Sequence, residues 1–261
     1  MPIKEGDLAL LTLYDKRGRP KKFLVTVKAG KSFHTHKGSL NLGELIGKNW
    51  GTVVKTNKGV PVEVHKPNLS DLIEKLGRGT QIIYPKDSGF ILLKCGIRPG
   101  SKVVEIGTGS GAMTLVLATF LGDSKLVTYD ISERSLRVAK ANLDKLGIKN
   151  VEFKHRDAKQ GIDERDLDCV IMDVPDPWEF LEVIRSSLKD GGVFVAFVPS
   201  CEQIPKTVLK AREVGFGLIE VHEILDREFE ANEKRTRPMP RMIAHTGFII
   251  IGRKLEGVRS S

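Results

Sequence analysis

The sequence predicts an α/β protein with a parallel sheet covered by helices on both faces, preceded by a small β-rich domain. Three observations lead to this prediction. Strand-like and helix-like segments alternate from residue 85 to residue 200, the first of these strands ends in the glycine-rich turn GTGSG (107–111), and residues 1–70 contain only short strand-like runs. Strands that alternate with helices are typical of βαβ units. We therefore expect two domains, 1–70 and 71–261.

The amino-terminal domain is expected to be a small antiparallel sheet or barrel. Its strand-like runs are rich in Val, Leu and Thr, and turn sequences such as DKRGRP and TNKG separate them; they are GDLALLTL, KKFLVTV, WGTVVKT and VPVEVHK. NLSDLIEKLG (68–77) predicts a short bridging helix with Ser70 as its N-cap. His34 and His36 could bind a metal, but no third ligand is in view, so we favour packing or RNA contact and expect no metal site.

The second domain is predicted to begin with a helix over PKDSGFILLKCGI (85–97), where Pro and Asp mark the start and Gly96 the end. The alternating elements that follow come in a fixed order: strand KVVEIG, helix AMTLVLATFLG, strand KLVTYD, helix ERSLRVAKANLDKLG, strands VEFKHRD and LDCVIMD, helix EFLEVIRSSLKDGG (179–192) and strand VFVAFVPS. GFIIIGRK predicts the last strand.

The net charge of +9 is concentrated in the first quarter of the chain. Residues 1–70 hold 13 Lys and Arg against 5 acidic residues, whereas residues 71–200 hold 18 against 19 and residues 201–261 hold 11 against 9. Such a field attracts phosphate backbones. A solvated basic surface is the alternative, but we favour a module that binds a polyanion.

Other classes of protein are disfavoured. The three cysteines, Cys95, Cys169 and Cys201, are far apart and form no C-x-x-C pair, which argues against a disulfide framework and a zinc site. No apolar run approaches the roughly 20 residues that span a bilayer, and the first residues do not resemble a signal peptide. We expect a cytoplasmic protein that neither contacts membranes nor binds a metal.

Acidic residues and glycines follow four consecutive predicted strands. The glycine turn follows the first strand, and Asp130, Asp157 and Asp173 come at or just after the second, third and fourth. In a doubly wound sheet these carboxyl ends meet where the strand order reverses, and ligands bind there. The sequence therefore predicts one cleft lined by all of these residues.

The cleft is expected to hold an adenosine cofactor. Gly107, Gly109 and Gly111, followed by Ala112, also satisfy the dinucleotide pattern, so NAD stays possible by spacing alone. Three features favour S-adenosylmethionine. Glu105 precedes the turn, Asp130 is placed to accept from both ribose hydroxyls, and Asp157-Ala158 suit the adenine edge. Glycines, with Ser110 between them, would let the backbone approach the methionine moiety.

Five segments together resemble the T-loop tRNA (adenine-N1)-methyltransferase family, TrmI type, and in particular its archaeal-like members. They are QIIYPKD (81–87), EIGTGSGAMT, YDISERSLRVAKANL, DVPDPW and RPMPRMIAHTGF (237–248). The resemblance implies a Rossmann-like class I SAM-dependent methyltransferase domain. It also implies methyl transfer from S-adenosylmethionine to N1 of a T-loop adenosine at tRNA position 58, possibly also 57, and a homotetramer.

Asp173, at the tip of the strand LDCVIMD, is the predicted catalytic residue. A carboxylate that accepts a hydrogen bond from the adenine amino group would orient the base, raise electron density at N1 and take up a proton. The prolines of DVPDPW fix the loop, and Trp178 is expected in the pocket wall. The alternative role for Asp173 is to cap the next helix, which Asp176 could do instead.

The remaining site residues are predicted partly from the resemblance and partly from their place in the chain. The target adenosine is expected to flip out of the tRNA loop onto an aromatic face supplied by Tyr84. The resemblance implies that Ile83 and Ser135 lie beside the cofactor, with packing as the alternative. His245 and Thr246 come just before the last strand and are expected beside the base, with a structural role as the alternative. A proline-rich loop that carries Arg235, Arg237 and Arg241 is expected to contact tRNA phosphates.

Two other functions remain open at this point. One is a methyltransferase of the same fold that acts on a protein or a small molecule. The other is a tRNA-binding subunit without activity. The basic amino-terminal domain and DVPDPW speak against the first, and the set Glu105, Gly107, Gly111, Asp130, Asp157 and Asp173 against the second.

Overall fold

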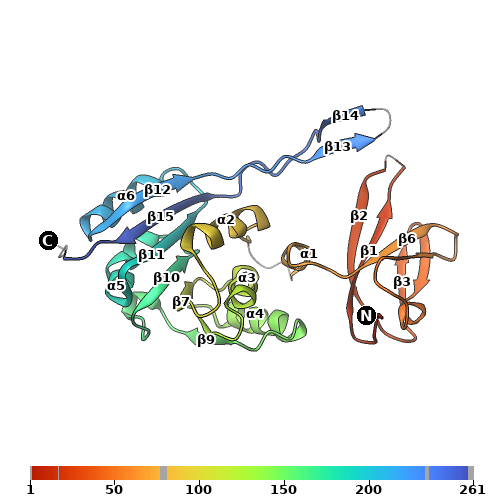
Figure 1. The fold of residues 1–261 in the computed structure, drawn as a ribbon, viewed down its shortest axis with the longest axis horizontal. Helices are drawn as coiled ribbons and strands as arrows, with labels where there is room; N and C mark the ends of the chain where they lie inside the picture. Colours follow the sequence, from red (N-terminus) through yellow and green to blue (C-terminus); the bar gives the residue numbers. More distant parts are fainter. Residues whose placement is uncertain (1, 17, 77–80, 233–234, 258–261) are drawn as a thin grey trace. The chain divides into compact units, whose positions relative to one another are not determined.

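The computed structural model describes residues 2–16, 18–76, 81–232 and 235–257. The chain divides into two compact units, Met1–Lys75 and Leu76–Ser261 (Figure 1). The helix predicted over 68–77 belongs to the first unit, so the division falls at its end.

The first unit is built on a four-stranded antiparallel sheet in the order β2-β1-β6-β5, and a separate hairpin pairs β3 with β4. Alternate residues of β1 and β6 enter a core that also contains the buried Val27 and Leu45. The elements are β1 (Leu8–Tyr14), β2 (Pro20–Thr26), β3 (Ser32–Thr35), β4 (Gly38–Asn41), the 3-10 helix η1 (Leu42–Leu45), β5 (Thr52–Lys55), β6 (Pro61–His65) and α1 (Leu69–Lys75).

One detail of this unit differs from the sequence prediction. The cap of α1 is Asn68 rather than Ser70: the Asn68 side chain accepts from the backbone N–H of Asp71 at 2.9 Å, and Asp71 accepts from that of Asn68 at 3.1 Å. This reciprocal pair satisfies two free donors of the first turn. His34 and His36 lie in and just after β3, and no group of three metal-binding side chains exists among the described residues.

The second unit contains a seven-stranded sheet in the order β12-β15-β11-β10-β7-β8-β9, in which only β15 runs antiparallel to its neighbours among the described pairs. The order reverses between β7 and β10, as the α/β prediction requires. The strands are β7 (Val103–Ile106), β8 (Leu126–Asp130), β9 (Val151–His155), β10 (Leu167–Met172), β11 (Leu188–Val198), β12 (Phe216–His222) and β15 (Phe248–Lys254).

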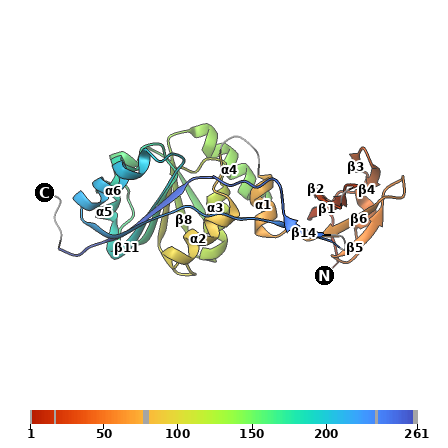
Figure 2. The same cartoon turned by 90° about the horizontal axis from the view of Figure 1, so that it is seen from above.

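Helices cover both faces of this sheet. Helices α2, α3 and α4 lie on one side, and α5 and α6 lie on the other (Figures 1 and 2). Their bounds are α2 (Pro85–Cys95), α3 (Ala112–Leu121), α4 (Glu133–Lys145), the 3-10 helices η2 (Ala158–Gln160) and η3 (Pro177–Phe180), α5 (Leu181–Ser187) and α6 (Gln203–Glu213). In the part of the chain that the structure describes, no helix is long and apolar enough to cross a membrane.

The helix predicted over 179–192 is wrong in its extent. Helix α5 ends at Ser187, and Leu188 turns to extended backbone with φ −76° and ψ 143° and pairs with Leu167 at the start of β11. Gly192 allows the backbone to pack closely here, because a Cβ there would lie 2.8–2.9 Å from the backbone oxygens of Lys189 and Leu167. The helix-forming composition of SSLK is thus overridden by pairing with the sheet.

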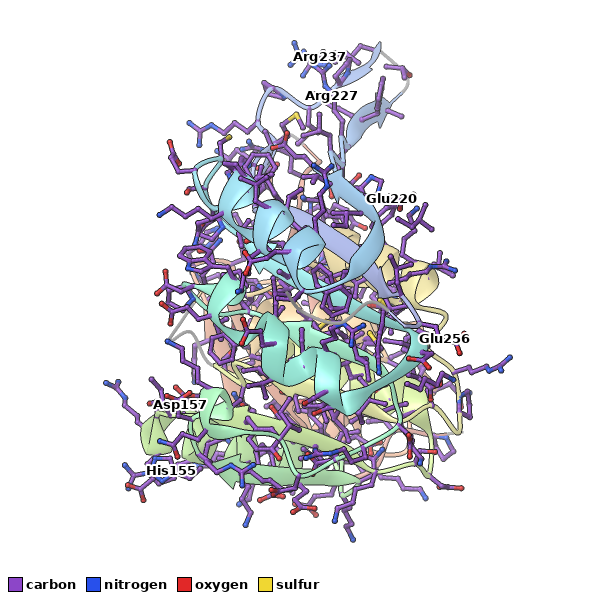
Figure 3. All side chains as sticks on the ribbon, turned by 90° about the vertical axis from the view of Figure 1, so that its left-hand side faces the viewer. His155, Asp157, Glu220, Arg227, Arg237 and Glu256 are labelled. Carbon is purple, nitrogen blue, oxygen red and sulfur yellow. The ribbon has the colours of Figure 1, made fainter. Side chains whose placement is uncertain are left out.

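A two-stranded hairpin, β13 (Phe229–Asn232) and β14 (Arg235–Pro238), projects from the sheet between β12 and β15 (Figure 3). The predicted proline-rich loop is therefore wrong for Arg235 and Arg237, which lie on β14 and form ion pairs with Glu230 at 2.9 and 3.5 Å. Arg241 lies in the irregular segment after the hairpin and is exposed.

Candidate active site

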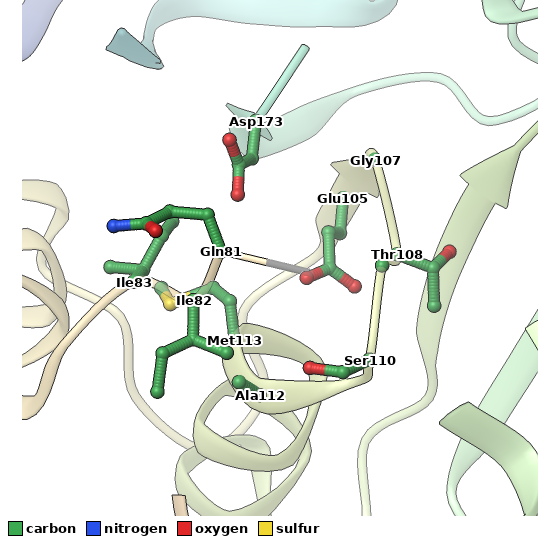
Figure 4. A pocket seen from close by; sticks show the side chains of 11 residues that line it. Gln81, Ile82, Ile83, Glu105, Gly107, Thr108, Ser110, Ala112, Met113 and Asp173 are labelled. Atoms are coloured by element: carbon green, nitrogen blue, oxygen red, sulfur yellow. The ribbon is translucent and has the colours of Figure 1, made fainter. Parts of the chain in front are cut away.

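A pocket with about 230 Å³ of empty space opens at the carboxyl ends of β7 and β10 (Figure 4). The segment before α2, the glycine turn, the start of α3 and the tip of β10 all contribute to it. Its lining consists of Gln81, Ile82, Ile83, Glu105, Gly107, Thr108, Gly109, Ser110, Ala112, Met113 and Asp173. The structure thus brings together seven of the residues that the sequence predicts for the site.

Two glycines of the turn are required by close approach. Gly107 has a φ of +94°, and a Cβ there would overlap the main-chain oxygen of Asp173. Gly111 has a φ of +84°, and a Cβ would lie 2.8 Å from Leu143 and 3.0 Å from Ala139 on α4. Side chains at such φ values are strained. Glycine therefore allows the tip of β10 and helix α4 to pack against the turn.

Glu105 lies at the floor of the pocket with only 1% of its surface exposed. Its Oε2 accepts hydrogen bonds from the hydroxyls of Thr114 at 2.6 Å and Thr128 at 2.7 Å. Its Oε1 is buried and has no hydrogen-bond partner among the described residues. Buried polar atoms are nearly always paired, so this oxygen is the first candidate for contact with a ligand.

Burial raises the pKa of Glu105 to about 8, and the two threonine hydroxyls, which favour the charged form, only partly oppose this rise. The negative charges of Asp173 and Asp130 raise its pKa further. The pocket of the empty protein therefore favours an uncharged carboxyl at this position.

Asp130 ends β8 beside the glycine turn. Its Oδ2 accepts from the backbone N–H of Gly109 at 3.0 Å and its Oδ1 from that of Ser132 at 2.7 Å. A carboxylate offers about four acceptor sites, so both oxygens keep capacity for ligand hydroxyls. The backbone bonds fix the orientation in which that capacity is presented.

Asp157, Ala158 and Ser135 do not line the described pocket, but they lie on segments next to it. β8 and β9 pair in parallel with Asp130 opposite His155, so Asp157 follows the strand adjacent to Asp130. Its side chain caps η2 by accepting from the N–H of Lys159 at 2.9 Å, and Ala158 is buried. Ser135 lies in the first turn of α4. Their contact with a cofactor stays a prediction.

Asp173 follows β10 directly, and its backbone N–H donates to the carbonyl of Ile106 at 2.9 Å, which holds it against β7. The protein atoms around the carboxyl group reduce its hydration and raise its pKa to about 7. Water still reaches the side chain from the pocket opening, so we expect the full rise only when a ligand fills the pocket. Asp173 does not cap η3, where Asp176 occupies the N-cap position without a side-chain bond.

A buried polar network fixes the segment that carries Ile83 and Tyr84. Lys86 donates to Asp87 at 3.0 Å, to the carbonyl of Ile224 at 2.6 Å and to Thr246 at 2.5 Å. The Thr246 hydroxyl donates to Asp87 at 2.7 Å. Tyr84 precedes this network as the N-cap of α2 and is partly exposed. Thr246 is thus committed to holding α2 against β15, and its predicted contact with the base finds no support in this geometry.

His245 is also engaged. Its Nδ1 lies 2.7 Å from Glu223 and its Nε2 lies 2.9 Å from the carbonyl of Pro199. Both neighbours are acceptors, which raises the pKa of His245, first through Pro199 and then through Glu223. These two contacts join the ends of β11 and β12, and a proton on each ring nitrogen would satisfy both of them.

Two family models match the chain. One, described as "tRNA methyltransferase complex GCD14 subunit", matches residues 65–247, and one described as "TrmI-like N-terminal" matches residues 2–54. The chain belongs to this tRNA methyltransferase family. The resemblance seen in the motifs and the class I methyltransferase fold are both confirmed.

Relatives in this family span nearly the whole chain. The tRNA (adenine(57)-N(1)/adenine(58)-N(1))-methyltransferase TrmI of Methanocaldococcus jannaschii is 36% identical, over 92% of this chain and 93% of the relative. The structure of tRNA (m1A58) methyltransferase TrmI from Aquifex aeolicus superposes with a TM-score of 0.87 at 34% identity, covering 98% and 100% of the two chains. A Thermotoga maritima structure described as a SAM-dependent O-methyltransferase has a TM-score of 0.91 at 37% identity, covering 97% and 94%.

Family membership does not place every predicted residue in the pocket. Trp178 packs against the main core, with the Lys206 ammonium 5.0 Å from the centre of its ring, and is not part of the described lining. Conversely, Gln81, Ile82, Thr108 and Met113 line the pocket and were not predicted as site residues. The first two lie in QIIYPKD, so the motif itself was a signal. Met113 carried none, because an apolar residue at a helix start is indistinguishable from core.

Proposed function

We propose that the protein transfers a methyl group from S-adenosylmethionine to N1 of an adenosine in the tRNA T loop. Position 58 is the proposed target, and position 57 is a second candidate because the M. jannaschii relative is named for both. The observation that carries the proposal is the carboxyl group of Asp173, which faces the pocket from the tip of β10 directly beside the glycine turn.

The residues present fit the proposed cofactor. The turn at Gly107–Gly111 leaves the backbone accessible, Glu105 offers an unpaired buried oxygen to an ammonium group, and Asp130 keeps acceptor sites for ribose hydroxyls. Asp157 and Ala158 follow the neighbouring strand on the side expected for adenine. When bound, S-adenosylmethionine supplies an electrophilic methyl group on a positively charged sulfur.

The role proposed for Asp173 is to orient and activate the base. As a carboxylate it accepts a hydrogen bond from the exocyclic amino group, which draws electron density toward N1 and fixes the in-line approach. It can then take up a proton as positive charge develops on the ring. A positioned base of this kind typically contributes about 10²–10⁴-fold. Tyr84 is proposed to support the flipped base from the adjoining segment.

The charge distribution supports tRNA as the partner. The net charge of residues 1–70 is +8, from 13 basic and 5 acidic residues, and Lys21, Lys28 and Lys31 of this unit are exposed. Phosphate contacts position a nucleic acid without reading its sequence. Arg241, exposed after the β13–β14 hairpin, is proposed to add a further phosphate contact. A homotetramer remains part of the proposal and is tested by light scattering.

The test is methyl transfer from labelled S-adenosylmethionine to unmodified tRNA transcript, with products mapped by nuclease digestion and mass spectrometry. Wild type should place 1-methyladenosine in the T loop, and Asp173→Ala should lose at least about 100-fold in rate. Asp176→Ala is the matched control, because it removes a carboxylate of the same loop that makes no cap bond. Label found in protein or small molecules but not in RNA would contradict the proposal.

A further inference from the structure

The hydrogen bonds around Glu105 have a defined direction. The single hydroxyl proton of Thr128 is donated to Glu105 Oε2, so in the 2.7 Å contact between Thr108 and Thr128 the donor is Thr108. Thr114 donates to the same oxygen. Oε2 is therefore an acceptor from two hydroxyls, and a proton on this carboxyl group would lie on Oε1.

The electrostatic surroundings of Glu105 are acidic. Asp173 from the tip of β10 and Asp130 from the end of β8 act on it, while α3 and the middle of β8 contribute the neutral Thr114 and Thr128. No Lys, Arg or His is among the described residues that line the pocket. An ionised carboxylate buried without a cation is costly, so it neutralises unless a positive charge arrives.

We propose that Glu105 carries a proton on Oε1 while the pocket is empty and releases it when a cationic group of the bound cofactor enters, so that cofactor binding releases a proton. The inference rests on the proposed function, which supplies a ligand with an ammonium and a sulfonium charge. In this step the Oε1–H bond breaks, the proton goes to the solvent buffer, and the carboxylate is left to pair with the cation. The raised pKa of Glu105 supports this at neutral pH.

The experiment is titration calorimetry of the protein with S-adenosylmethionine, at each pH in two buffers that titrate near that pH (phosphate and Tris at pH 7). The different ionisation enthalpies of the two buffers reveal the number of protons exchanged. With a pKa of about 8 for Glu105, wild type should release about 0.9 proton from this group at pH 7, and much less at pH 9.5. Glu105→Gln keeps the shape and the acceptor oxygen but has no proton to lose. The Glu105→Gln variant should therefore release fewer protons than wild type at pH 7, by most of one proton. Both proteins are titrated with the same ligand, so ionisation of the ligand itself cancels in this difference.

Thr114→Val provides a second variant that retains the carboxyl group. Removing one donor to Oε2 disfavours the ionised form, so proton release should persist to higher pH than in wild type. Binding without proton release in wild type, or equal release by Glu105→Gln, would overturn the inference and leave the cofactor proposal intact. Failure of wild type to bind S-adenosylmethionine would instead contradict the proposed function.

Discussion

At the residue scale, the two carboxyl groups that face the pocket differ in their exposure to water. Glu105 is fully enclosed and partnered on one oxygen only, whereas Asp173 is reached by water from the opening. Both have a raised pKa because the protein lowers their hydration. A catalytic carboxylate with a pKa near neutrality is well matched to accept a proton at physiological pH.

The role proposed for Asp173 predicts how the reaction depends on pH. Only the ionised form of Asp173 can take up a proton from the adenine amino group, so kcat, which reports the ligand-filled pocket, should rise with pH through about 7. The value of kcat/KM for the cofactor should rise with pH through about 8, where Glu105 ionises in the cofactor-free protein. Glu105→Gln should remove this rise in kcat/KM. Rates measured from pH 5.5 to 9 check this. A wild-type kcat that does not change between pH 6 and 8 would contradict a base role for Asp173.

Glu105 should also lower the stability of the empty protein at neutral pH. Its folded pKa of about 8 lies above its ordinary value of 4.5, so the folded state binds more protons than the unfolded state between these values. Stability from this group is present below pH 4.5 and is lost as pH rises toward 8. Glu105→Gln should therefore raise the free energy of unfolding at pH 8 by about 1–3 kcal/mol. Urea denaturation compares wild type and Glu105→Gln at pH 8. A variant less stable than wild type would contradict the prediction that the buried carboxyl group of Glu105 destabilises the fold.

At the scale of elements, the glycine turn determines how closely β10 can approach β7. Gly107→Ala should destabilise the fold by about 1–3 kcal/mol and weaken cofactor binding at least about tenfold, because the new Cβ meets the backbone of Asp173. Gly100→Ala is the matched control: its φ is +90°, but nothing lies within 4 Å of the added Cβ. Chemical denaturation and calorimetry measure both effects. Equal losses in the two variants would show that backbone strain, and not contact with Asp173, is responsible.

A second set of contacts between elements fixes α2 and β15 near the pocket. The Lys86–Asp87–Thr246 network is largely buried, with Asp87 at 0% exposure and the Lys86 side chain at 10%. Its consequence is that QIIYPKD and HTGF, which are about 160 residues apart in the chain, form one structural unit. The two motifs are separate in the sequence, and hydrogen bonds join them in the folded structure.

At the scale of the whole molecule, the uneven charge predicts how tRNA binding depends on salt. Lys21→Glu, Lys28→Glu and Lys31→Glu combined should weaken tRNA binding and reduce the slope of log K against log salt by up to about 0.9 per lost phosphate contact. The control is Lys140→Glu combined with Lys145→Glu. These two lysines are exposed on α4, in the nearly neutral part of the chain. Filter binding at several salt concentrations measures this. An unchanged slope in the triple variant would remove the amino-terminal unit from the tRNA interface.

Whereas α6, β12 and the two hairpins were not predicted, the sequence by itself determined the order of the elements from residue 85 to residue 200 and most of the pocket. Local signals were sufficient there: a glycine turn after an apolar strand has few alternatives, and parallel strands place Glu105, the turn and Asp173 at one edge. The spacing of the glycines alone left two cofactors open, NAD and S-adenosylmethionine. The family motifs added the reaction class, methyl transfer.

Only the tertiary structure decided the features that depend on partners distant in the chain. Leu188 joins β11 because Leu167 is available to pair with it, Arg235 lies on a strand because β13 lies opposite, and Trp178 turns to the core. The unpaired oxygen of Glu105 and the hydrogen bond from Thr246 to Asp87 likewise depend on residues distant in the chain. Burial and hydrogen bonding are properties of the folded surroundings, and no local pattern of residues encodes them.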